Sequence, residues 1–397
     1  MRRPLALLLA ALSLALAGCA PAAPGGTSSA PGSLSSPDLS AAQSQPDPEP
    51  QPEPVPEPDP RQEAVDRALS GMTLEEKVGQ LFFARCPEMH AAALASEYHL
   101  GGYILFGRDF KDRTREEVTD CIAAYQRAAD IPLLIGVDEE GGTVVRVSSN
   151  PELAPHRFQS PQKLALASSG QGDVFAEDAW EKSSLLLSLG INVNFAPVAD
   201  VSTNPGDFIY DRTLGQDAQA TAGYVTSVVE AMGDCGIGSV LKHFPGYGNN
   251  VDTHTGIAVD QRPYEGFVAS DFLPFQAGIA AGADAVLVSH NIVTCMDGDL
   301  PASLSPEAHR VLREELGFDG VVLTDDLAMD AIDQYAREGS AAVLALQAGN
   351  DMVVTTDFTQ QIPQVLQALE EGVLSPEVID RAAARVLGWK YDLGLFA

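Results

Sequence analysis

The chain has 397 residues, of which 45% are hydrophobic, and its 55 Asp and Glu against 24 Lys and Arg give a formal net charge of −31. A surface of that charge repels nucleic acid and anionic membranes, so binding to either by general electrostatic attraction is excluded. The length fits one large folded domain in addition to a leader segment.

The first residues predict export from the cytoplasm. Arg2 and Arg3 precede an apolar run over residues 5–17, and small residues come directly before Cys19. A basic start, an apolar run too short to cross a bilayer and a small-residue cleavage site indicate a signal peptide over residues 1–18. The cysteine at the cleavage site resembles the lipobox of bacterial lipoproteins, which implies acylation of Cys19 and attachment to a membrane. The alternative is an ordinary secretory peptide with an incidental cysteine.

Residues 19–61 have the composition of a tether. Eight of the fifteen residues from Pro46 to Pro60 are proline, alternating mostly with Asp, Glu and Gln, and residues 20–60 contain no Lys or Arg. Such a segment cannot bury a core, and alternating prolines favour an extended chain of about 3 Å per residue. We therefore expect a disordered linker that carries no chemistry, followed by a folded domain over residues 62–397.

Short apolar runs alternate with amphipathic helical patterns through the rest of the chain. The runs that read as strands are residues 80–85, 102–106, 133–137, 192–195, 238–242, 285–289, 320–324 and 351–354. Helical patterns cover residues 114–129, 176–189, 218–235, 307–316 and 339–348, and the first opens on a capping box, Thr114 to Glu117. Eight strands, most of them separated by helices, predict a single α/β domain of the (β/α)8 TIM-barrel type. A doubly wound sheet is less favoured because no Gly-rich phosphate turn follows an early strand.

The remaining four cysteines are widely spaced and form no Cys-x-x-Cys pair. They are Cys86, Cys121, Cys235 and Cys295. This spacing predicts mostly free, buried thiols, and one disulfide stays open because the protein is expected to be exported.

Ionisable side chains follow five of the predicted strands. Asp138 follows the third strand, Asp200 the fourth, Lys242 and His243 end the fifth, His290 ends the sixth and Asp325 ends the seventh. A single strand-end Asp is often only a helix cap, but five strands ending in this way are hard to explain by capping. In a barrel these ends share one face, where active sites are built.

Six sequence motifs in order resemble glycoside hydrolase family 3, in its β-N-acetylhexosaminidase branch. They are Met72–Leu81, Val137–Gly142, Asn194–Asp200, Lys242–Gly246, Asp252–His254 and Thr324–Leu327. Each motif alone is weakly specific for the family, but six of them in the same order over residues 64–397 make a strong resemblance. Two features favour this branch: the chain ends with its barrel, and Asp252 with His254 resembles the dyad that replaces the acid/base carboxylate of the two-domain members.

The resemblance implies a retaining reaction through a covalent glycosyl-enzyme intermediate. Asp325 would be the nucleophile, His254 the acid and then the base, and Asp252 the group that holds the imidazole. Asp326 would be a neighbouring or capping group. The residues implied to bind the sugar are Asp138, Arg146, Arg212, Lys242, His243 and His290. No metal or organic cofactor is implied. Alternative roles stay open for Arg146, as an ion-pair partner of Glu140, and for His290, as a packing residue at the barrel rim.

The implied substrate is a glycan with terminal β-linked GlcNAc outside the membrane, first of all peptidoglycan fragments. Transfer to phosphate in place of water stays open because a histidine acid/base tolerates an anionic nucleophile. Tyr247 and Thr213-Leu214 depart from the family pattern near the sugar pocket, so the sugar and aglycone preference is less secure. The sequence indicates no oligomeric state.

Three alternatives come from other classes of protein. A metal-dependent amidohydrolase barrel normally has His-x-His at the end of its first strand, where this chain has Phe83-Ala84-Arg85-Cys86. A non-catalytic glycan-binding lipoprotein usually needs two lobes and a hinge. A pseudoenzyme is disfavoured by the presence of Asp325, Asp252 and His254.

Overall fold

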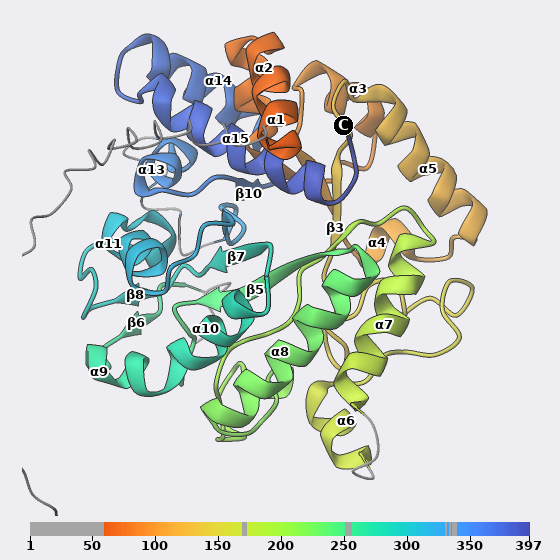
Figure 1. Cartoon of the computed structure of the whole chain (residues 1–397), viewed down its shortest axis with the longest axis vertical. Coiled ribbons are helices and arrows are strands. Elements are labelled where there is room, and N and C mark those ends of the chain that lie inside the picture. Colours follow the sequence, from red (N-terminus) through yellow and green to blue (C-terminus); the bar gives the residue numbers. More distant parts are fainter. Residues whose placement is uncertain (1–58, 169–172, 251–255, 330–331, 333–334, 336–339) are drawn as a thin grey trace, which may run out of the picture. The chain divides into compact units, whose positions relative to one another are not determined.

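A computed structural model of the chain describes residues 59–168, 173–250, 256–329, 332, 335 and 340–397 (Figure 1). Eight parallel strands form one sheet in the order β10-β1-β2-β3-β4-β5-β7-β9. They are β1 Phe82–Arg85, β2 Gly102–Leu105, β3 Leu134–Val137, β4 Val193–Asn194, β5 Gly238–Phe244, β7 Ala285–Val288, β9 Val321–Thr324 and β10 Val353–Thr355. A parallel bridge between Leu323 and Met352 joins the two ends of this order. The predicted (β/α)8 barrel is confirmed.

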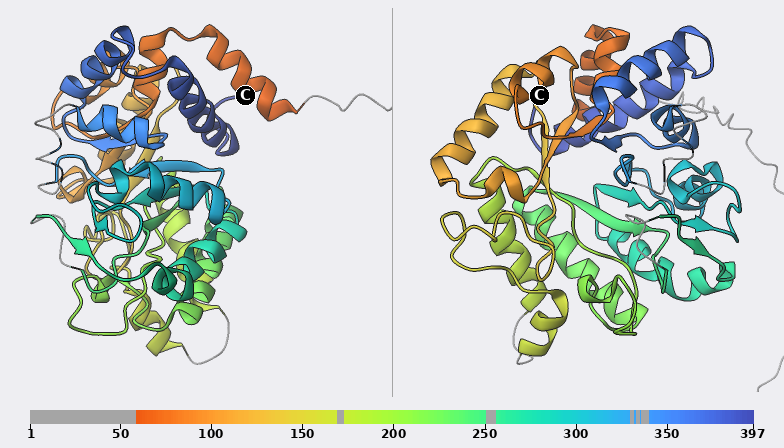
Figure 2. Two further views of the ribbon diagram at one scale, coloured as in Figure 1. Left: turned by 90° about the vertical axis from the view of Figure 1, so that its left-hand side faces the viewer. Right: turned by 180° about the vertical axis from the view of Figure 1, so that it is seen from behind.

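Helices surround the strands on the outside of the ring (Figures 1 and 2). They are α1 Pro60–Gly71, α2 Leu74–Gln80, α3 Ala91–Glu97, α4 Gly107–Phe110, α5 Arg115–Ala128, α6 Pro161–Ala167, α7 Val174–Leu187, α8 Ala218–Cys235, α9 Tyr264–Gly266, α10 Phe272–Ala280, α11 Pro306–Arg310, α13 Ala341–Ala348, α14 Phe358–Glu370 and α15 Pro376–Asp392. The capping box predicted at Thr114 is present, because its side chain accepts from the Glu117 N–H and Glu117 accepts from the Thr114 N–H. The other predicted helices occur within a few residues of their expected bounds.

Three details of the sequence prediction are corrected by the structure. Gln80 ends α2 and does not start the first strand. Helix α1 begins at Pro60, inside the segment expected to be a tether, and Asp59 caps it by accepting from the Arg61 N–H. A second, two-stranded sheet pairs β6 Val259–Asp260 with β8 Ile292–Val293. Strands of two residues are too short to show an alternating hydrophobic pattern, so no periodicity predicts them.

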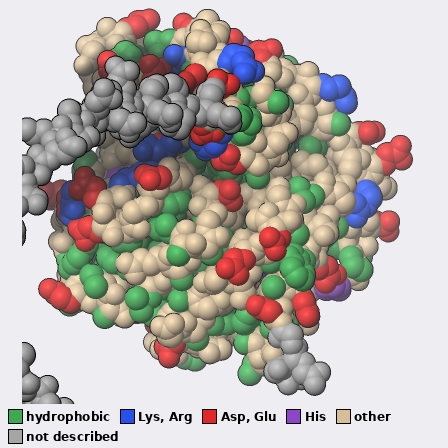
Figure 3. Space-filling view, viewed as in Figure 1, with side chains coloured by type: hydrophobic (Ala, Val, Ile, Leu, Met, Phe, Trp, Pro, Cys, Tyr) green, Lys and Arg blue, Asp and Glu red, His purple; other side chains and the backbone are tan. Residues whose placement is uncertain are grey.

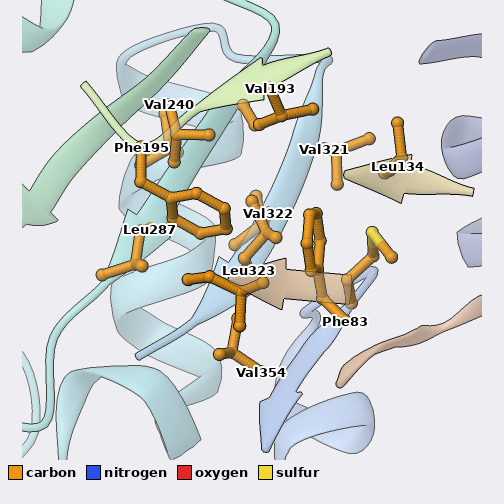
Figure 4. Close-up of a cluster of buried hydrophobic side chains, with 14 of the residues drawn as sticks. Phe83, Leu134, Val193, Phe195, Val240, Leu287, Val321, Val322, Leu323 and Val354 are labelled. Atoms are coloured by element: carbon orange, nitrogen blue, oxygen red, sulfur yellow. The ribbon is translucent and has the colours of Figure 1, made fainter. Parts of the chain in front are cut away.

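The interior of the barrel is filled by apolar side chains from most of its strands (Figure 4). At its centre the rings of Phe83 and Phe195 meet edge to face, with centroids 5.2 Å apart. Gly136 makes room for both, since a Cβ there would lie 2.5 Å from the Phe195 ring and 2.8 Å from the Phe83 ring. The barrel is therefore a packed core, and a ligand can enter only above these rings.

The apolar core is followed by charged side chains at the carboxyl ends of the strands, because side chains alternate between the two faces of each strand. Residues two positions apart on a strand share a face. Arg85 therefore stands above Phe83, Asp138 above Gly136, Lys242 above Val240 and Asp325 above Leu323, all at the carboxyl ends of their strands. The charged residues at the strand ends thus face the barrel axis.

At the other end of the barrel, Lys390 of α15 is completely buried. Its Nζ donates to Gln80 Oε1 at 2.6 Å, and burial lowers the pKa of Lys390 to about 7. An unfolded chain holds this lysine protonated up to its ordinary pKa near 10.5. Between these two values the unfolded state binds more protons than the folded state, so the free energy of unfolding rises with pH.

We expect the free energy of unfolding to rise by about 2 kcal/mol from pH 7 to pH 9 through Lys390 alone. Lys390→Met removes the titrating group, so the difference in stability between wild type and variant should change by that amount over this range. Denaturant unfolding of both proteins at pH 7 and pH 9 measures it. A constant difference between the two proteins would show that Lys390 keeps an ordinary pKa.

The four cysteines of the folded domain are free, as predicted, but they are not all buried. Cys86, Cys121, Cys235 and Cys295 are all free, and Cys86 is buried as expected, but Cys295 is exposed. Among the helices that the structure describes, none is long and apolar enough to cross a membrane. Asp and Glu side chains are spread over the visible face of the molecule, and Lys and Arg are fewer (Figure 3).

Candidate active site

A pocket of about 280 Å³ opens at the carboxyl ends of the barrel strands. Apolar residues such as Ile104, Phe195 and Leu287 form its floor. Its charged or titratable lining consists of Arg85, Asp138, Arg146, Arg212, Lys242, His243, Asp325 and Asp326. Five of the predicted sugar-binding residues and the predicted nucleophile are therefore brought together in one pocket.

Glu140 organises the cations of this pocket from below. Lys242 Nζ lies 2.5 Å from Glu140 Oε1, and Arg212 donates to both carboxylate oxygens, at 2.7 and 3.0 Å. Burial alone would raise the pKa of Glu140, but Arg212 and Lys242 outweigh it and hold that pKa well below its usual range. The carboxylate thus stays ionised and fixes two cations side by side.

Asp138 is a second carboxylate that contacts the cations of the pocket, and it is more exposed than Glu140. Lys242 donates to Asp138 Oδ1 at 2.7 Å, and Arg146 Nη2 lies 3.5 Å from Asp138 Oδ2. The alternative in which Arg146 pairs with Glu140 is therefore wrong, since Glu140 pairs with Arg212 and Lys242 instead. Asp138 and Lys242 present both a carboxylate and an ammonium to the pocket, a combination that suits sugar hydroxyls, which both donate and accept.

An irregularity in β5 explains how two adjacent residues both face the pocket. The pairing of β5 with β7 shifts between Lys242 and Phe244, so His243 falls out of the alternation. Such irregularities re-aim side chains next to active sites. His243 Nδ1 lies 2.7 Å from Asp200 Oδ2 and its Nε2 lies 3.1 Å from Arg212 Nη2. The ring thus donates to Asp200 and accepts from Arg212, which assigns its proton to Nδ1.

Glu139 was not among the residues predicted for the site, although it follows β3 directly after Asp138. Its carboxylate accepts from the backbone N–H groups of Arg146 and Val147, at 2.8 and 2.7 Å, and from the Ser148 hydroxyl. The buried carboxylate thereby fixes the loop that carries Arg146 at the pocket. Three consecutive acids, Asp138, Glu139 and Glu140, follow this strand. A sugar-binding site needs only one of them, so the other two could have been expected to have structural roles.

Asp325 and Asp326 lie together at the end of β9. Asp325 N donates to the Val288 carbonyl at 2.9 Å, which continues the sheet, and Asp325 Oδ1 accepts from Asp326 N at 2.9 Å. Burial raises the pKa of Asp326, whose Oδ1 also accepts from Ala328 N at 3.0 Å. Asp325 lies two positions beyond Leu323 on the strand, so its side chain is on the same face and points toward the barrel axis.

His290 does not line the pocket, although it was predicted as a sugar ligand. It is fully buried behind β9, with its Nδ1 2.7 Å from the Ser303 hydroxyl and its Nε2 3.0 Å from the Asp326 carbonyl. This position suits a residue that supports the backbone of the Asp325-Asp326 pair.

Asp252 and His254 lie in residues 251–255, outside the part of the chain that the structure describes. The described residues on both sides of this segment are tied to one ionic cluster. Asn250 donates to Asp260 Oδ2 at 2.7 Å, and Arg262 pairs with Asp260 at 2.8 Å and with Asp271 at 2.9 Å. Arg262 also donates to the Gly246 carbonyl at 3.1 Å.

Within the described ranges, one group of side chains has the composition of a metal site: Glu76, His99 and Asp130. Each of them precedes a barrel strand, so the group lies at the amino ends of the strands, away from the pocket.

The fold and the pocket define a class of protein, a parallel (β/α)8 barrel with paired acids and bases at the carboxyl ends of its strands, which is the arrangement of barrel enzymes. The family model described as "Glycosyl hydrolase family 3 N terminal domain" matches residues 73–388. The chain belongs to this family and is a glycoside hydrolase, so the amidohydrolase alternative is wrong.

Two relatives and one solved structure show how far the similarity extends. The β-hexosaminidase of Stenotrophomonas maltophilia (strain R551-3) is 36% identical over 295 residues, which are 73% of this chain and 86% of that protein. The β-hexosaminidase LpqI of Mycobacterium tuberculosis (strain ATCC 25618 / H37Rv) is 35% identical over 314 residues, 76% of this chain and 78% of that protein. A glycoside hydrolase family 3 β-N-acetylglucosaminidase structure from Paenibacillus sp. str. FPU-7 has a TM-score of 0.75 and 34% identity, covering 82% of this chain and 64% of that one.

Proposed function

We propose that the protein is a retaining exo-β-N-acetylglucosaminidase, which removes terminal β-linked GlcNAc through a covalent glycosyl-enzyme intermediate. One observation carries this proposal: Lys242 and Arg212, held on Glu140, share a pocket with the strand-end carboxylate Asp325. The similarity to proteins named β-hexosaminidase and β-N-acetylglucosaminidase supports the same reaction.

The proposed mechanism assigns the residues as follows. The Asp138, Arg212, Lys242 and His243 cluster holds the hydroxyl groups of the terminal sugar. Asp325 attacks the anomeric carbon and forms an ester, while His254 gives its proton to the leaving oxygen. His254 then takes a proton from water, which attacks the anomeric carbon and releases the Asp325 carboxylate. Asp252 holds the imidazole in position and favours its protonated form.

The raised pKa of Asp326 supports the choice of Asp325 as nucleophile. A nucleophile must be ionised at working pH, and burial favours the protonated form of Asp326. Asp325 also has the strand-end position that points toward the barrel axis.

The experiment that tests this function is an assay of the purified protein on 4-nitrophenyl β-N-acetylglucosaminide and the matching β-glucoside, with and without EDTA. We expect nitrophenol from the acetamido sugar alone, unaffected by EDTA. His254→Ala should slow a glycan with a poor leaving group far more than the aryl glycoside, because nitrophenolate departs with little protonation. Equal slowing of both would make His254 a structural residue, and no turnover of either aryl glycoside would refute the activity.

The natural substrate and location complete the proposal. The substrate is a GlcNAc-containing peptidoglycan fragment, and the protein is exported and held on the outer side of the cell membrane by lipid on Cys19. The basic and apolar start, the small residues before Cys19 and the proline-rich segment support this location. Mass spectrometry of the protein extracted from membranes should show a mature chain that begins at a diacylated Cys19; an unmodified cysteine would contradict the anchor.

A further inference from the structure

Arg262 is a partly buried arginine that the proposed mechanism does not use. It lies between β6 and α9 and is not among the residues that line the pocket (Figure 1). Its side chain is 28% exposed, whereas the two carboxylates that it contacts, those of Asp260 and Asp271, are 1% and 2% exposed. Buried carboxylates are costly unless a cation compensates them, so Arg262 is part of the packed structure and not a solvated surface group.

Every donor of the Arg262 guanidinium is used. Nε and Nη2 donate to Asp260 Oδ2 at 2.9 and 2.8 Å, and Nη1 donates to both carboxylate oxygens of Asp271 at 2.9 Å. Nη2 also donates to the Gly246 carbonyl at 3.1 Å. The ring of Phe267 restrains the group further, with its centroid 4.2 Å from Cζ. A planar guanidinium can join three parts of the chain in this way, and an ammonium cannot reproduce its fixed geometry.

Two glycines bring the backbone after β5 against this ion cluster. Gly246 has a φ of 122°, and a Cβ there would lie 2.4 Å from Asp271 Oδ1. Gly248 has a φ of 55°, and a Cβ there would lie 2.5 Å from Arg262 Cζ. Glycine is required at both positions, because a side chain would push the backbone away from the pair formed by Arg262 and Asp271.

Asn250 connects the same stretch of chain to the other carboxylate of the cluster. Its Nδ2 donates to Asp260 Oδ2 at 2.7 Å. The proposed acid/base, His254, is four positions after Asn250 and six positions before Asp260. Arg262 and its partners therefore fix the described chain on both sides of residues 251–255.

The same stretch of chain begins at the sugar-binding pocket. Tyr247 N donates to Asp200 Oδ1 at 2.7 Å, and Asp200 Oδ2 lies 2.7 Å from Nδ1 of His243, which lines the pocket. The chain that leads to His254 thus starts from a fixed point, and Arg262 fixes its further course. A proton donor needs such support, because a displacement of about 1 Å can slow a reaction by about 10²-fold.

We propose that Arg262 is a positioning residue for the proposed acid/base. It holds the backbone at Gly246 and, through Asp260, the side chain of Asn250, and thereby sets where His254 stands relative to the pocket. This inference rests on the proposed function and adds a residue outside the pocket on which protonation of the leaving group depends. The effect of Arg262 is transmitted through the chain, since Arg262 itself does not line the pocket.

The test compares wild type with Arg262→Lys on two aryl glycosides that differ in their leaving groups. The 4-nitrophenyl β-N-acetylglucosaminide needs little protonation, whereas the 4-methoxyphenyl glycoside releases a much more basic phenolate. We expect Arg262→Lys to lower kcat/KM for the methoxyphenyl glycoside by about fivefold or more beyond its effect on the nitrophenyl glycoside, because lysine keeps the charge but not the three contacts. An uncharged replacement would leave two buried carboxylates unpaired, so it would test stability more than position.

His254→Ala connects this effect to the acid/base. In the His254→Ala background, Arg262→Lys should lose its selective effect, because no proton donor is left to be positioned. Asn250→Ala removes the contact with Asp260 without leaving a buried charge unpaired, and we expect a smaller selective loss of the same kind. Asn250→Ala also decides the question if Arg262→Lys does not fold.

Arg310→Lys is the matched control. Arg310 also contacts two carboxylates, those of Glu307 and Glu315, each at 2.7 Å, but it lies away from the pocket. This variant should change kcat/KM for neither glycoside.

Two results would overturn the inference and leave Arg262 as a purely structural ion pair. The first is an equal loss on both glycosides for Arg262→Lys and for Asn250→Ala, and the second is a selective loss that persists in the His254→Ala background. A failure of the proposed function looks different. If His254→Ala slows both glycosides equally, His254 is not the acid/base and the inference falls with that assignment; if wild type hydrolyses neither glycoside, the glycosidase activity itself is refuted.

Discussion

Asp325→Ala should lower kcat for 4-nitrophenyl β-N-acetylglucosaminide by about 10³-fold or more, because loss of a covalent nucleophile removes the reaction path itself. Asp325 lies at a fixed strand end, where its backbone N–H donates to the Val288 carbonyl at 2.9 Å. The variant should fold normally, since the side chain lies at the pocket mouth and not in the core.

Asp326 offers a matched comparison, since it is the adjacent carboxylate in the same pocket. Its Oδ1 accepts from Ala328 N at 3.0 Å, a contact that shapes the turn after β9. Asp326→Asn keeps the acceptor oxygen, so we expect a much smaller loss of kcat than for Asp325→Ala. Azide should restore activity to Asp325→Ala by taking the place of the carboxylate. A larger loss for the Asp326 variant, or turnover by Asp325→Ala within about tenfold of wild type, would reassign the nucleophile.

Glu140→Gln should lower the free energy of unfolding by about 3–5 kcal/mol, because it leaves a buried arginine and lysine with half their compensating charge. Glu140 is 4% exposed and pairs with Arg212 and Lys242 at 2.7 and 2.5 Å. For a domain of this size we expect a fall in Tm of about 4–7 °C. Because both cations lose their position, kcat/KM should fall by about 10²-fold as well.

The pH dependence of that effect follows from the pKa of Glu140, which lies well below its usual range. A carboxylate with a lowered pKa contributes stability above the pKa of the unfolded state and loses it as the pH falls through the folded value. The difference between wild type and Glu140→Gln should therefore be constant between pH 6 and pH 8.

Glu88→Gln is the surface control for Glu140→Gln. Glu88 also faces an arginine, Arg108 at 3.2 Å, but its side chain is 74% exposed. An exposed pair of this kind contributes little, so we expect a change within about 0.5 kcal/mol. If Glu140→Gln behaved like this control in thermal unfolding and in the assay, Glu140 would not be the organising charge of the pocket.

Much of the architecture can be predicted from the sequence, because strands that are buried on both faces consist of continuous runs of apolar residues. All eight barrel strands are found in this way, and of the polar residues predicted at their ends Asp138, Lys242, His243 and Asp325 line one pocket. The side chain two positions beyond a buried strand residue must share its face, so Asp138, Lys242 and Asp325 could be expected at one pocket before any contact was known.

The partners of these side chains were decided only by the tertiary structure. Glu140 appeared in the sequence as a neighbour of Arg146, but the fold brings it to Arg212 and Lys242, which are 72 and 102 positions away in the chain. Charge pairing across a barrel depends on the closure of the ring and on strand register, and neither leaves a local pattern. For the same reason His290 looked like a ligand at a strand end but packs behind β9.

The sequence by itself determined the barrel, the family and the chemical types available at its mouth, because these depend on hydrophobic periodicity and on motifs within a few neighbouring residues. Tertiary structure decided which charges neutralise one another, and it leaves the buried Nε atoms of Arg85 and Arg146 without a hydrogen-bond partner among the described residues. That distinction is a property of distances between strands, since Coulomb attraction and hydrogen bonds act between atoms in contact wherever they stand in the chain.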